Sequence, residues 1–88
     1  MTSTPTPLVV VIGGGTGMGR DIALDQASLG RDVLIVGRRE DPLAETQRSA
    51  ADPERISAVV ADASTVDGVT SILDAVGDRP IALSLIHI

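Results

Sequence analysis

The chain has 88 residues, enough for one small domain with a modest core but short for an α/β enzyme built on an open sheet. Its 7 cationic side chains, all arginine, stand against 12 acidic ones and give a net charge of −5. There is no basic run of the kind that tracks a phosphate backbone, so we expect no nucleic-acid partner. The absence of cysteine excludes disulfides, thiolate chemistry and cysteine metal sites, and we expect no metal.

The amino-terminal segment, residues 1–7, is rich in threonine and proline, has no basic residue and is predicted to be a disordered lead. The apolar run behind it, residues 8–12, is far too short for a signal-peptide core or a membrane span. We therefore expect a cytoplasmic protein with no membrane partner, whose folded domain begins at Leu8.

Two strand-helix units are predicted in the first half of the chain. Residues 8–12 have the composition of a strand buried on both faces of a parallel sheet, and a helix over about residues 17–29 follows, stopped by Gly30. Residues 33–36 repeat the buried-strand pattern, and Asp41 is expected to cap the next helix, with Pro42 at its first position. That helix runs over residues 43–51 to a break. In the first helix three apolar side chains fall near one face: Met18, Ile22 and Leu29.

A third unit of the same kind follows. Residues 56–61 have the composition of a buried strand, and residues 64–67 have the spacing of a capping box that begins at Ser64. Gly77 ends the helix behind it, and a fourth strand begins at Ile81. Five apolar residues recur at helical intervals and predict a stripe facing a sheet: Val66, Val69, Ile72, Leu73 and Val76. Strands that alternate with helices in this way indicate right-handed βαβ units and a parallel sheet.

A glycine-rich stretch joins the first strand to the first helix. The glycines at 13, 17 and 19 follow the spacing Gly-x-x-x-Gly-x-Gly, and no register of the stretch fits Gly-x-Gly-x-x-Gly. Some of them are expected to take positive φ, and others to leave room for a pyrophosphate beside the helix N-terminus. A phosphate loop is disfavoured, because Arg20 and Asp21 replace its Lys and its Ser or Thr. A turn that only reverses the chain is the remaining alternative.

From this motif the sequence resembles the short-chain dehydrogenase/reductase family, over residue 8 to about residue 83. The family's first motif, Thr-Gly-x-x-x-Gly-x-Gly, matches at Gly13, Gly17, Met18 and Gly19, and Ile12 stands where the family usually has Thr. The resemblance implies an α/β fold, a Rossmann-like doubly wound parallel sheet truncated to about βαβαβαβ, with a dinucleotide site. The cofactor-binding residues expected in this loop are Gly13, Gly15, Thr16, Gly17, Met18, Gly19 and Arg20.

The end of the second strand bears on which dinucleotide binds. An acidic residue there accepts hydrogen bonds from the ribose of NAD, whereas arginine accommodates the 2′-phosphate of NADP. Gly37 takes the acidic position and Arg38 and Arg39 follow, while Arg20 could reach the same phosphate, a pairing similar to that of NADP-preferring members of the family. We therefore expect NADP, with NAD less favoured. The alternative is that the two arginines only solvate a loop and that Glu40 contacts a ribose.

Asp62, at the end of the third strand, is similar to the family's Asp that hydrogen-bonds the adenine amino group, with Ala63 as its backbone neighbour. An aspartate in this place can also cap the helix that follows. The single histidine, His87, has no candidate partner near it and is assigned no role.

The catalytic apparatus that the resemblance implies is absent from the sequence. The family carries Asn-Asn-Ala-Gly after its fourth strand, and further on a catalytic Ser and a Tyr-x-x-x-Lys pair in which Tyr is the general acid or base. This chain has no Tyr, no Lys and no Asn. We therefore expect no catalytic residue in it, no turnover and weak NADP(H) binding at best.

The last residues, 83–88, can be back-translated as CTG TCT CTT ATA CAC ATC, which resembles the end of a transposase-based sequencing adapter. We therefore predict that this tail is non-native and that residues 8–83 are the N-terminal part of a longer NAD(P)-binding domain. The alternative is a genuine small protein with an apolar strand end, which would leave a sheet edge unprotected.

The sequence thus favours the NADP-binding N-terminal segment of a short-chain oxidoreductase that acts, when full length, on a carbonyl or alcohol substrate and can form homo-oligomers. The first alternative is a non-catalytic NADP(H)-binding redox sensor of the same fold, against which a downstream Tyr-x-x-x-Lys would argue. A methyltransferase that binds S-adenosylmethionine is disfavoured. Such a protein is expected to have an acidic residue at the end of the second strand, where Gly37 and Arg38 stand. Exposed apolar edges also predict poor solubility.

Overall fold

The computed structural model describes residues 7–13 and 17–86, with the backbone alone described for residues 82–86. Residues 1–6 of the predicted lead, Gly15 and Thr16 of the loop, and His87 lie outside the described residues. Among the described helices, none is both long and apolar enough to cross a membrane. The elements alternate along the chain: β1 (Leu8–Ile12), α1 (Gly17–Ser28), β2 (Asp32–Gly37), α2 (Glu40–Ser49), the 3₁₀ turn η1 (Pro53–Arg55), β3 (Ile56–Val60), α3 (Val66–Val76) and β4 (Ile81–Ile86).

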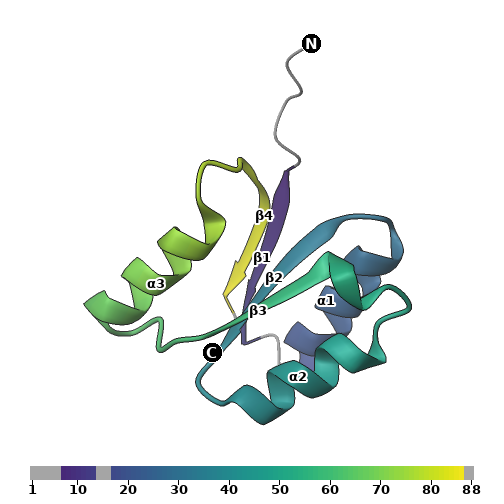
Figure 1. The fold of residues 1–88 in the computed structure, drawn as a ribbon, viewed down its shortest axis with the longest axis horizontal. Helices are drawn as coiled ribbons and strands as arrows, with labels where there is room; N and C mark the ends of the chain where they lie inside the picture. Colours follow the sequence, from purple (N-terminus) through teal and green to yellow (C-terminus); the bar gives the residue numbers. More distant parts are fainter. Residues whose placement is uncertain (1–6, 14–16, 87–88) are drawn as a thin grey trace.

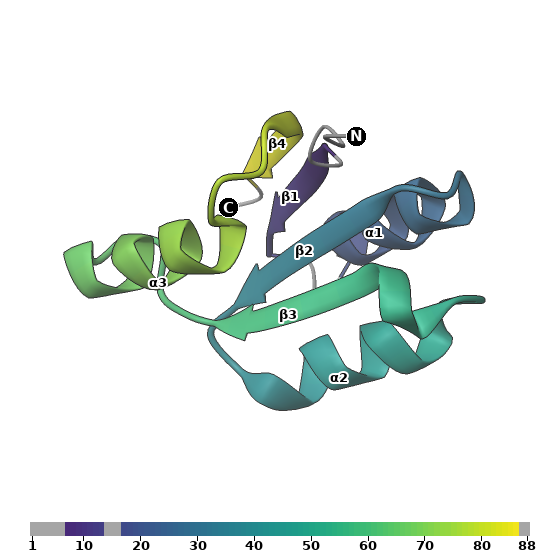
Figure 2. The same cartoon turned by 45° about the horizontal axis from the view of Figure 1, so that its top comes forward.

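The strands form one parallel sheet in the order β3-β2-β1-β4. Helices α1 and α2 cover one face and α3 covers the other, so the sheet lies between two helical layers (Figure 1, Figure 2). The chain moves outward from β1 to β2 and β3, then returns past β1 to β4, so the strand order reverses at β1. This confirms the predicted doubly wound α/β fold.

The centre of the sheet is β1 and β2. Residues 8–11 and 33–36 are buried, as their apolar composition predicts. Alternate side chains serve opposite layers: Val9 and Val11 belong to the cluster that includes Leu43 of α2, whereas Val10 belongs to the cluster that includes Ile72 of α3. Each such side chain contributes about 1.5–3 kcal/mol through burial, so these two strands dominate the stability of the fold.

The buried face of α1 differs from the predicted one. Met18 and Leu29 are 63% and 62% exposed, and Ile22 is only partly buried. The residues that face the sheet are small and four positions apart: Gly19, Ala23 and Ala27. Because they are small, α1 can lie close to the sheet, and a pattern based on large apolar residues does not detect such a face.

The predicted apolar stripe of α3 is correct only in part. Ile72 and Val76 are buried with Gly68, again in a row with a spacing of four. This row packs against buried side chains of β1 and β2, and the neighbouring row is exposed. The other three members of the stripe are exposed, Val66 by 82%: Val66, Val69 and Leu73.

The composition of β3 had predicted a strand buried on both faces, and the structure shows that this is wrong. Ile56 is buried, but Ser57, Ala58 and Val60 are exposed. The reason is that β3 lies at the edge of the sheet, where β2 is its one partner among the described strands, and the helices cover it incompletely. Composition alone does not distinguish an edge strand from a central one.

Helix α2 begins two residues earlier than predicted. Its N-cap is Arg39, which makes no side-chain capping bond, so Asp41, the predicted cap, lies in the first turn and Pro42 is the third helical residue. Glu40 and Asp41 place two carboxylates at the positive end of the helix dipole, which stabilises a helix start that lacks a side-chain cap.

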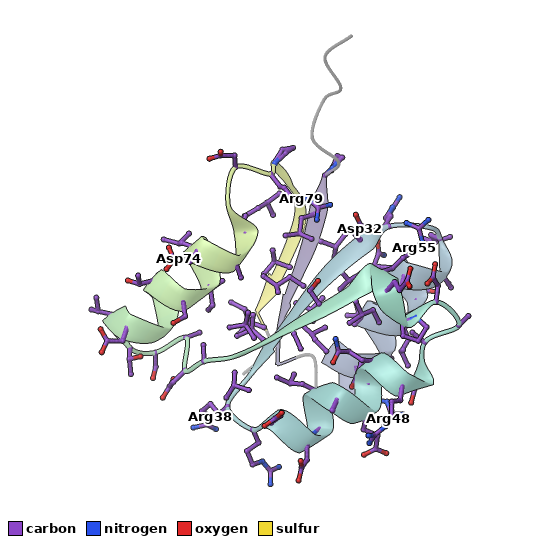
Figure 3. All side chains as sticks on the ribbon, in the orientation of Figure 1. Asp32, Arg38, Arg48, Arg55, Asp74 and Arg79 are labelled. Carbon is purple, nitrogen blue, oxygen red and sulfur yellow. The ribbon has the colours of Figure 1, made fainter. Side chains whose placement is uncertain are left out.

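At the amino-terminal edge of the sheet, Asp32 joins segments from the starts of several strands. Its carboxylate accepts hydrogen bonds from Arg79, which precedes β4 (2.8 Å), and from Arg55, which precedes β3 (3.3 Å). Arg79 also donates to the carbonyl of Pro7, before β1 (3.4 Å). Figure 3 shows the three labelled side chains together at this end. All three are about one-third exposed, so each ion pair contributes about 1 kcal/mol or less.

The close packing of α1 predicts that Ala23→Leu lowers the free energy of unfolding by about 1–3 kcal/mol, because Ala23 is fully buried and a larger side chain overpacks the contact. Met18→Ala, at an exposed position of the same helix, is the control and is expected to change it by no more than about 0.5 kcal/mol. Urea denaturation followed by circular dichroism measures both. Equal effects of the two substitutions would show that the buried face is wrongly assigned.

Candidate functional site

The carboxyl ends of β1, β2 and β3 lie next to one another at one edge of the sheet. The amide of Gly13, after β1, donates to the carbonyl of Val36 (2.6 Å), and the amide of Ala61, after β3, donates to the carbonyl of Gly37 (2.9 Å). Because the strands are parallel, the segments that follow them all leave from this edge. The edge also contains the point where the strand order reverses, which is where open α/β sheets bind their ligands.

The described part of the glycine loop has the backbone that its glycines predict. Gly13 has φ 92° and Gly17 has φ 57°, both in the left-handed region that favours glycine. Gly19 is buried on the side of α1 that faces the sheet. Helix α1 therefore starts at the carboxyl edge, and the N–H groups of its first turn, which have no partner within the helix, form a donor set suited to an anion.

Gly37, the last residue of β2, is packed closely against α2. A Cβ built on Gly37 would lie 3.1 Å from Cδ2 of Leu43, which is almost fully buried. Any larger residue at position 37 would therefore require Leu43 to shift by a few tenths of an ångström. The local packing thus favours glycine at the place where an acidic side chain would contact a ribose.

Two arginines follow Gly37. Arg38 and Arg39 are exposed, and Figure 3 shows Arg38 at the end of β2, beside the start of α2. An open hollow with a volume of about 410 Å³ lies at the start of α2 and is lined by Arg39, Glu40, Asp41 and Pro42. A guanidinium group at the rim suits an anion, and the two carboxylates suit hydroxyl groups that donate hydrogen bonds.

The structure does not bring Arg20 together with Arg38 and Arg39. Its guanidinium group donates to the hydroxyl of Ser49 (2.8 Å) and lies 3.8 Å from a carboxylate oxygen of Glu45. Ser49 is the last residue of α2, about 15 Å along the helix axis from Arg39. In this state Arg20 ties α1 to α2 and does not extend the cationic group at the end of β2.

The segment after β3 forms a tight turn over residues 62–65, called here the Asp62 turn. One carboxylate oxygen of Asp62, Oδ1, accepts hydrogen bonds from the amide (2.9 Å) and from the hydroxyl (2.6 Å) of Ser64. The carbonyl of Asp62 accepts from the amide (3.1 Å) and the hydroxyl (2.9 Å) of Thr65. The turn thus fixes both the backbone and the side chain of Asp62.

The capping-box spacing had predicted Ser64 as the cap of α3, but the cap is Thr65. The Thr65 hydroxyl oxygen accepts from the amide of Gly68 (2.9 Å), while the Ser64 hydroxyl is bonded to Asp62. A Cβ on Gly68 would overlap the carbonyl of Asp62, so the helix can approach the turn only because residue 68 is glycine. The Asp-x-Ser spacing of an Asx turn was the available sequence signal for Ser64.

The hydrogen bonds from Ser64 also favour the ionised form of Asp62. The hydroxyl of Ser64, then its amide, and more weakly the positive charge of Arg38 hold the pKa of the Asp62 carboxyl below its ordinary value, against a small opposing effect of desolvation. Asp62 is therefore an ionised acceptor at neutral pH, and the positive charge of Arg38, at the end of β2, acts on it.

Comparison with known proteins relates the chain to one family. A family model described as short chain dehydrogenase matches residues 7–86. The crystal structure of a short chain dehydrogenase from Bacillus anthracis has a TM-score of 0.83 and 25% identity over 93% of this chain. A metagenomic short-chain oxidoreductase, solved in complex with NADP, has a TM-score of 0.67 and 26% identity over 91% of it. A probable 2,4-dienoyl-CoA reductase of Bacillus subtilis is 42% identical over 40 residues, 46% of this chain.

The matched proteins are much longer than this chain. It spans 34% of the Bacillus anthracis structure and 38% of the metagenomic one, and the aligned part is 16% of the Bacillus subtilis relative. The similarity therefore concerns the part of those proteins that corresponds to this chain, and not their remaining parts.

The contact between α3 and the Asp62 turn predicts that Gly68→Ala lowers the free energy of unfolding by about 1–3 kcal/mol, because the new Cβ must displace the Asp62 carbonyl or the start of α3. Ser71→Ala, at an exposed position of the same helix, is the control. Thermal denaturation and amide chemical shifts of residues 61–66 check this. Unchanged shifts in Gly68→Ala would contradict the packing described.

The hydrogen bonds to Asp62 predict that Ser64→Ala raises the pKa of this carboxyl towards its ordinary value, because the largest of the effects that lower it is lost. The stabilisation from the lowered pKa is present above the unfolded-state pKa and is lost as the pH falls through the folded-state pKa, so the variant should lose less stability on acidification. Carboxyl carbon shifts followed by NMR between acidic and neutral pH measure the pKa. An unchanged value would contradict the assignment.

Proposed function

The chain belongs to the short-chain dehydrogenase family, and from this premise we propose that it is the NADP-binding segment of an oxidoreductase. In this proposal the carboxyl edge of the sheet holds the adenosine, the 2′-phosphate and the pyrophosphate of the cofactor. NADP supplies the hydride acceptor or donor at its nicotinamide ring. The residues of this chain bind and orient the rest of the molecule.

The choice of NADP rests on the residues at the end of β2. Position 37 holds a glycine against which Leu43 is packed, so an acidic side chain there would push on the core. Arg38 and Arg39 follow, both exposed, and Arg39 lines the hollow at the start of α2. Guanidinium groups bind phosphate through charge-assisted and often bidentate hydrogen bonds. This arrangement suits the additional phosphate of NADP better than the bare ribose of NAD.

The pyrophosphate is assigned to the glycine loop and the first turn of α1. Positive φ at Gly13 and Gly17 turns the chain from β1 into the helix, and the missing side chains let an anion approach the backbone. The helix N-terminus adds N–H donors and the positive end of its dipole. The proposed contacts are Gly13, Gly15, Thr16, Gly17, Met18 and Gly19.

The adenine is assigned to the Asp62 turn. The adenine amino group is a donor and an ionised carboxylate is purely an acceptor, so the side chain of Asp62 is chemically matched to it, with the backbone of Ala63 alongside. The contact proposed between Arg20 and the 2′-phosphate requires the guanidinium group to leave Ser49 and Glu45. It is therefore tested separately from Arg38 and Arg39.

For the whole protein we infer hydride transfer between NADP and a carbonyl or alcohol carbon. The similar proteins are named a dehydrogenase, a reductase and an oxidoreductase with NADP, which supports an oxidoreductase. The 88 residues contain neither Tyr nor Lys, so this segment is expected to bind the cofactor without turnover. A redox sensor would use the same edge, and a turnover assay on the whole protein distinguishes the two.

Removing both cations at the end of β2 tests the choice of cofactor. We expect the double variant Arg38→Ala with Arg39→Ala to bind NADPH at least tenfold more weakly, because each lost charge-assisted hydrogen bond is worth about 1.5–3 kcal/mol, and to bind NADH almost unchanged. Titration of cofactor fluorescence measures both affinities. The chain has no tryptophan to interfere.

Arg48→Ala is the matched control, since Arg48 is exposed in the last turn of α2, away from Arg38 (Figure 3). It removes one positive charge and should leave the ratio of the two affinities unchanged. Arg20→Ala, measured alongside, lowers the affinity for NADPH relative to that for NADH only if Arg20 reaches the 2′-phosphate. Tighter binding of NADH than of NADPH to the unaltered chain would refute the assignment to NADP.

A further inference from the structure

We propose that Ser64 is a positioning residue, which presents the carboxylate of Asp62 to the amino group of the adenine ring and so gives the site its preference for adenine. This rests on the proposed function, since it concerns the same dinucleotide. Neither the glycine spacing nor the arginines of the β2 end involve Ser64, and its role follows from the hydrogen bonds of the turn.

The two hydrogen bonds from Ser64 fall on the same oxygen. Oδ1 of Asp62 receives both the amide (2.9 Å) and the hydroxyl (2.6 Å), so neither bond occupies Oδ2. The terminal torsion of an aspartate is otherwise broad and roughly two-fold, so an unrestrained carboxylate would rotate. With Oδ1 held by two donors, the orientation of Oδ2 is fixed before any ligand arrives.

A fixed acceptor matters for recognition of the base. The amino group of adenine is a planar donor, and an acceptor that is already oriented avoids the entropy of ordering on binding. Ser64 supplies this order from two residues away along the chain, without contacting the base itself.

The backbone of the turn is held independently of the Ser64 hydroxyl. The carbonyl of Asp62 accepts from the amide and hydroxyl of Thr65, and the Thr65 hydroxyl accepts from the amide of Gly68 in α3. Ser64→Ala removes one donor to Oδ1 and leaves these bonds and the Ser64 amide in place. The substitution therefore separates the orientation of the side chain from the fold of the turn.

The experiment compares two ligands on the 88-residue chain: NADPH and its hypoxanthine counterpart, in which a carbonyl replaces the amino group. We expect the unaltered chain to prefer NADPH by about tenfold, as for one hydrogen bond to a charged group. In Ser64→Ala the preference should fall to about threefold or less, through weaker binding of NADPH, with the hypoxanthine ligand little changed. Ser64→Thr, which keeps the hydroxyl, should restore it.

Ser71→Ala is the matched control, because Ser71 is exposed on α3 and its hydroxyl donates to the backbone carbonyl of Asp67 (3.1 Å), away from the turn. It should leave the preference unchanged. Equal weakening of both ligands in Ser64→Ala would show a merely structural role, and an unaltered preference would show no role; either result overturns the inference. If the unaltered chain binds both ligands equally, the inference fails while dinucleotide binding stands. If it binds neither, the proposed function fails.

Discussion

Parallel pairing of β1 with β2 on one side and β4 on the other is the constraint on which this molecule depends. It requires the chain to cross over after every strand, so a helix must cover one face or the other. It also requires every strand to end at the same edge. The glycine loop, the two arginines after β2 and the Asp62 turn meet for this reason, although up to about fifty residues separate them in the sequence.

The fold was predictable from composition because β1 and β2 are buried on both faces, which leaves an uninterrupted apolar run such as residues 33–36. Details that depend on how closely two layers approach were not. Ala23 and Ala27 allow α1 to lie close to the sheet, but residues this small leave no strong hydrophobic pattern in the sequence. β3 is mainly apolar, as a central strand is, but it lies at the edge of the sheet and Val60 is exposed.

Within the candidate site, the backbone was more predictable than the side chains. Positive φ at Gly13 and Gly17 follows from the spacing of glycines at a strand-helix junction. The partners of long side chains depend instead on elements distant in sequence: Arg20 is bonded to Ser49 in another helix, 29 positions away. Ser64 was expected to cap α3, but its hydroxyl instead donates to the carboxylate of Asp62, two residues earlier in the chain. Local hydrogen-bonding side chains of this kind have several partners of similar energy.

Asp32 and its two arginines lie at the end of the sheet opposite to the glycine loop and Arg38 (Figure 3). The two ends of the sheet therefore differ: partly exposed ion pairs hold the strand starts at one end, and Gly13, Gly17 and Arg38 lie at the other. Salt weakens exposed ion pairs through screening and leaves hydrophobic burial intact. Ionic strength is therefore expected to act on the two ends differently, by loosening the strand starts at one and by competing with the phosphates of the proposed cofactor at the other. Substitutions at Asp32, Arg55 or Arg79 therefore change how the strand starts are held without touching the residues proposed to bind the cofactor.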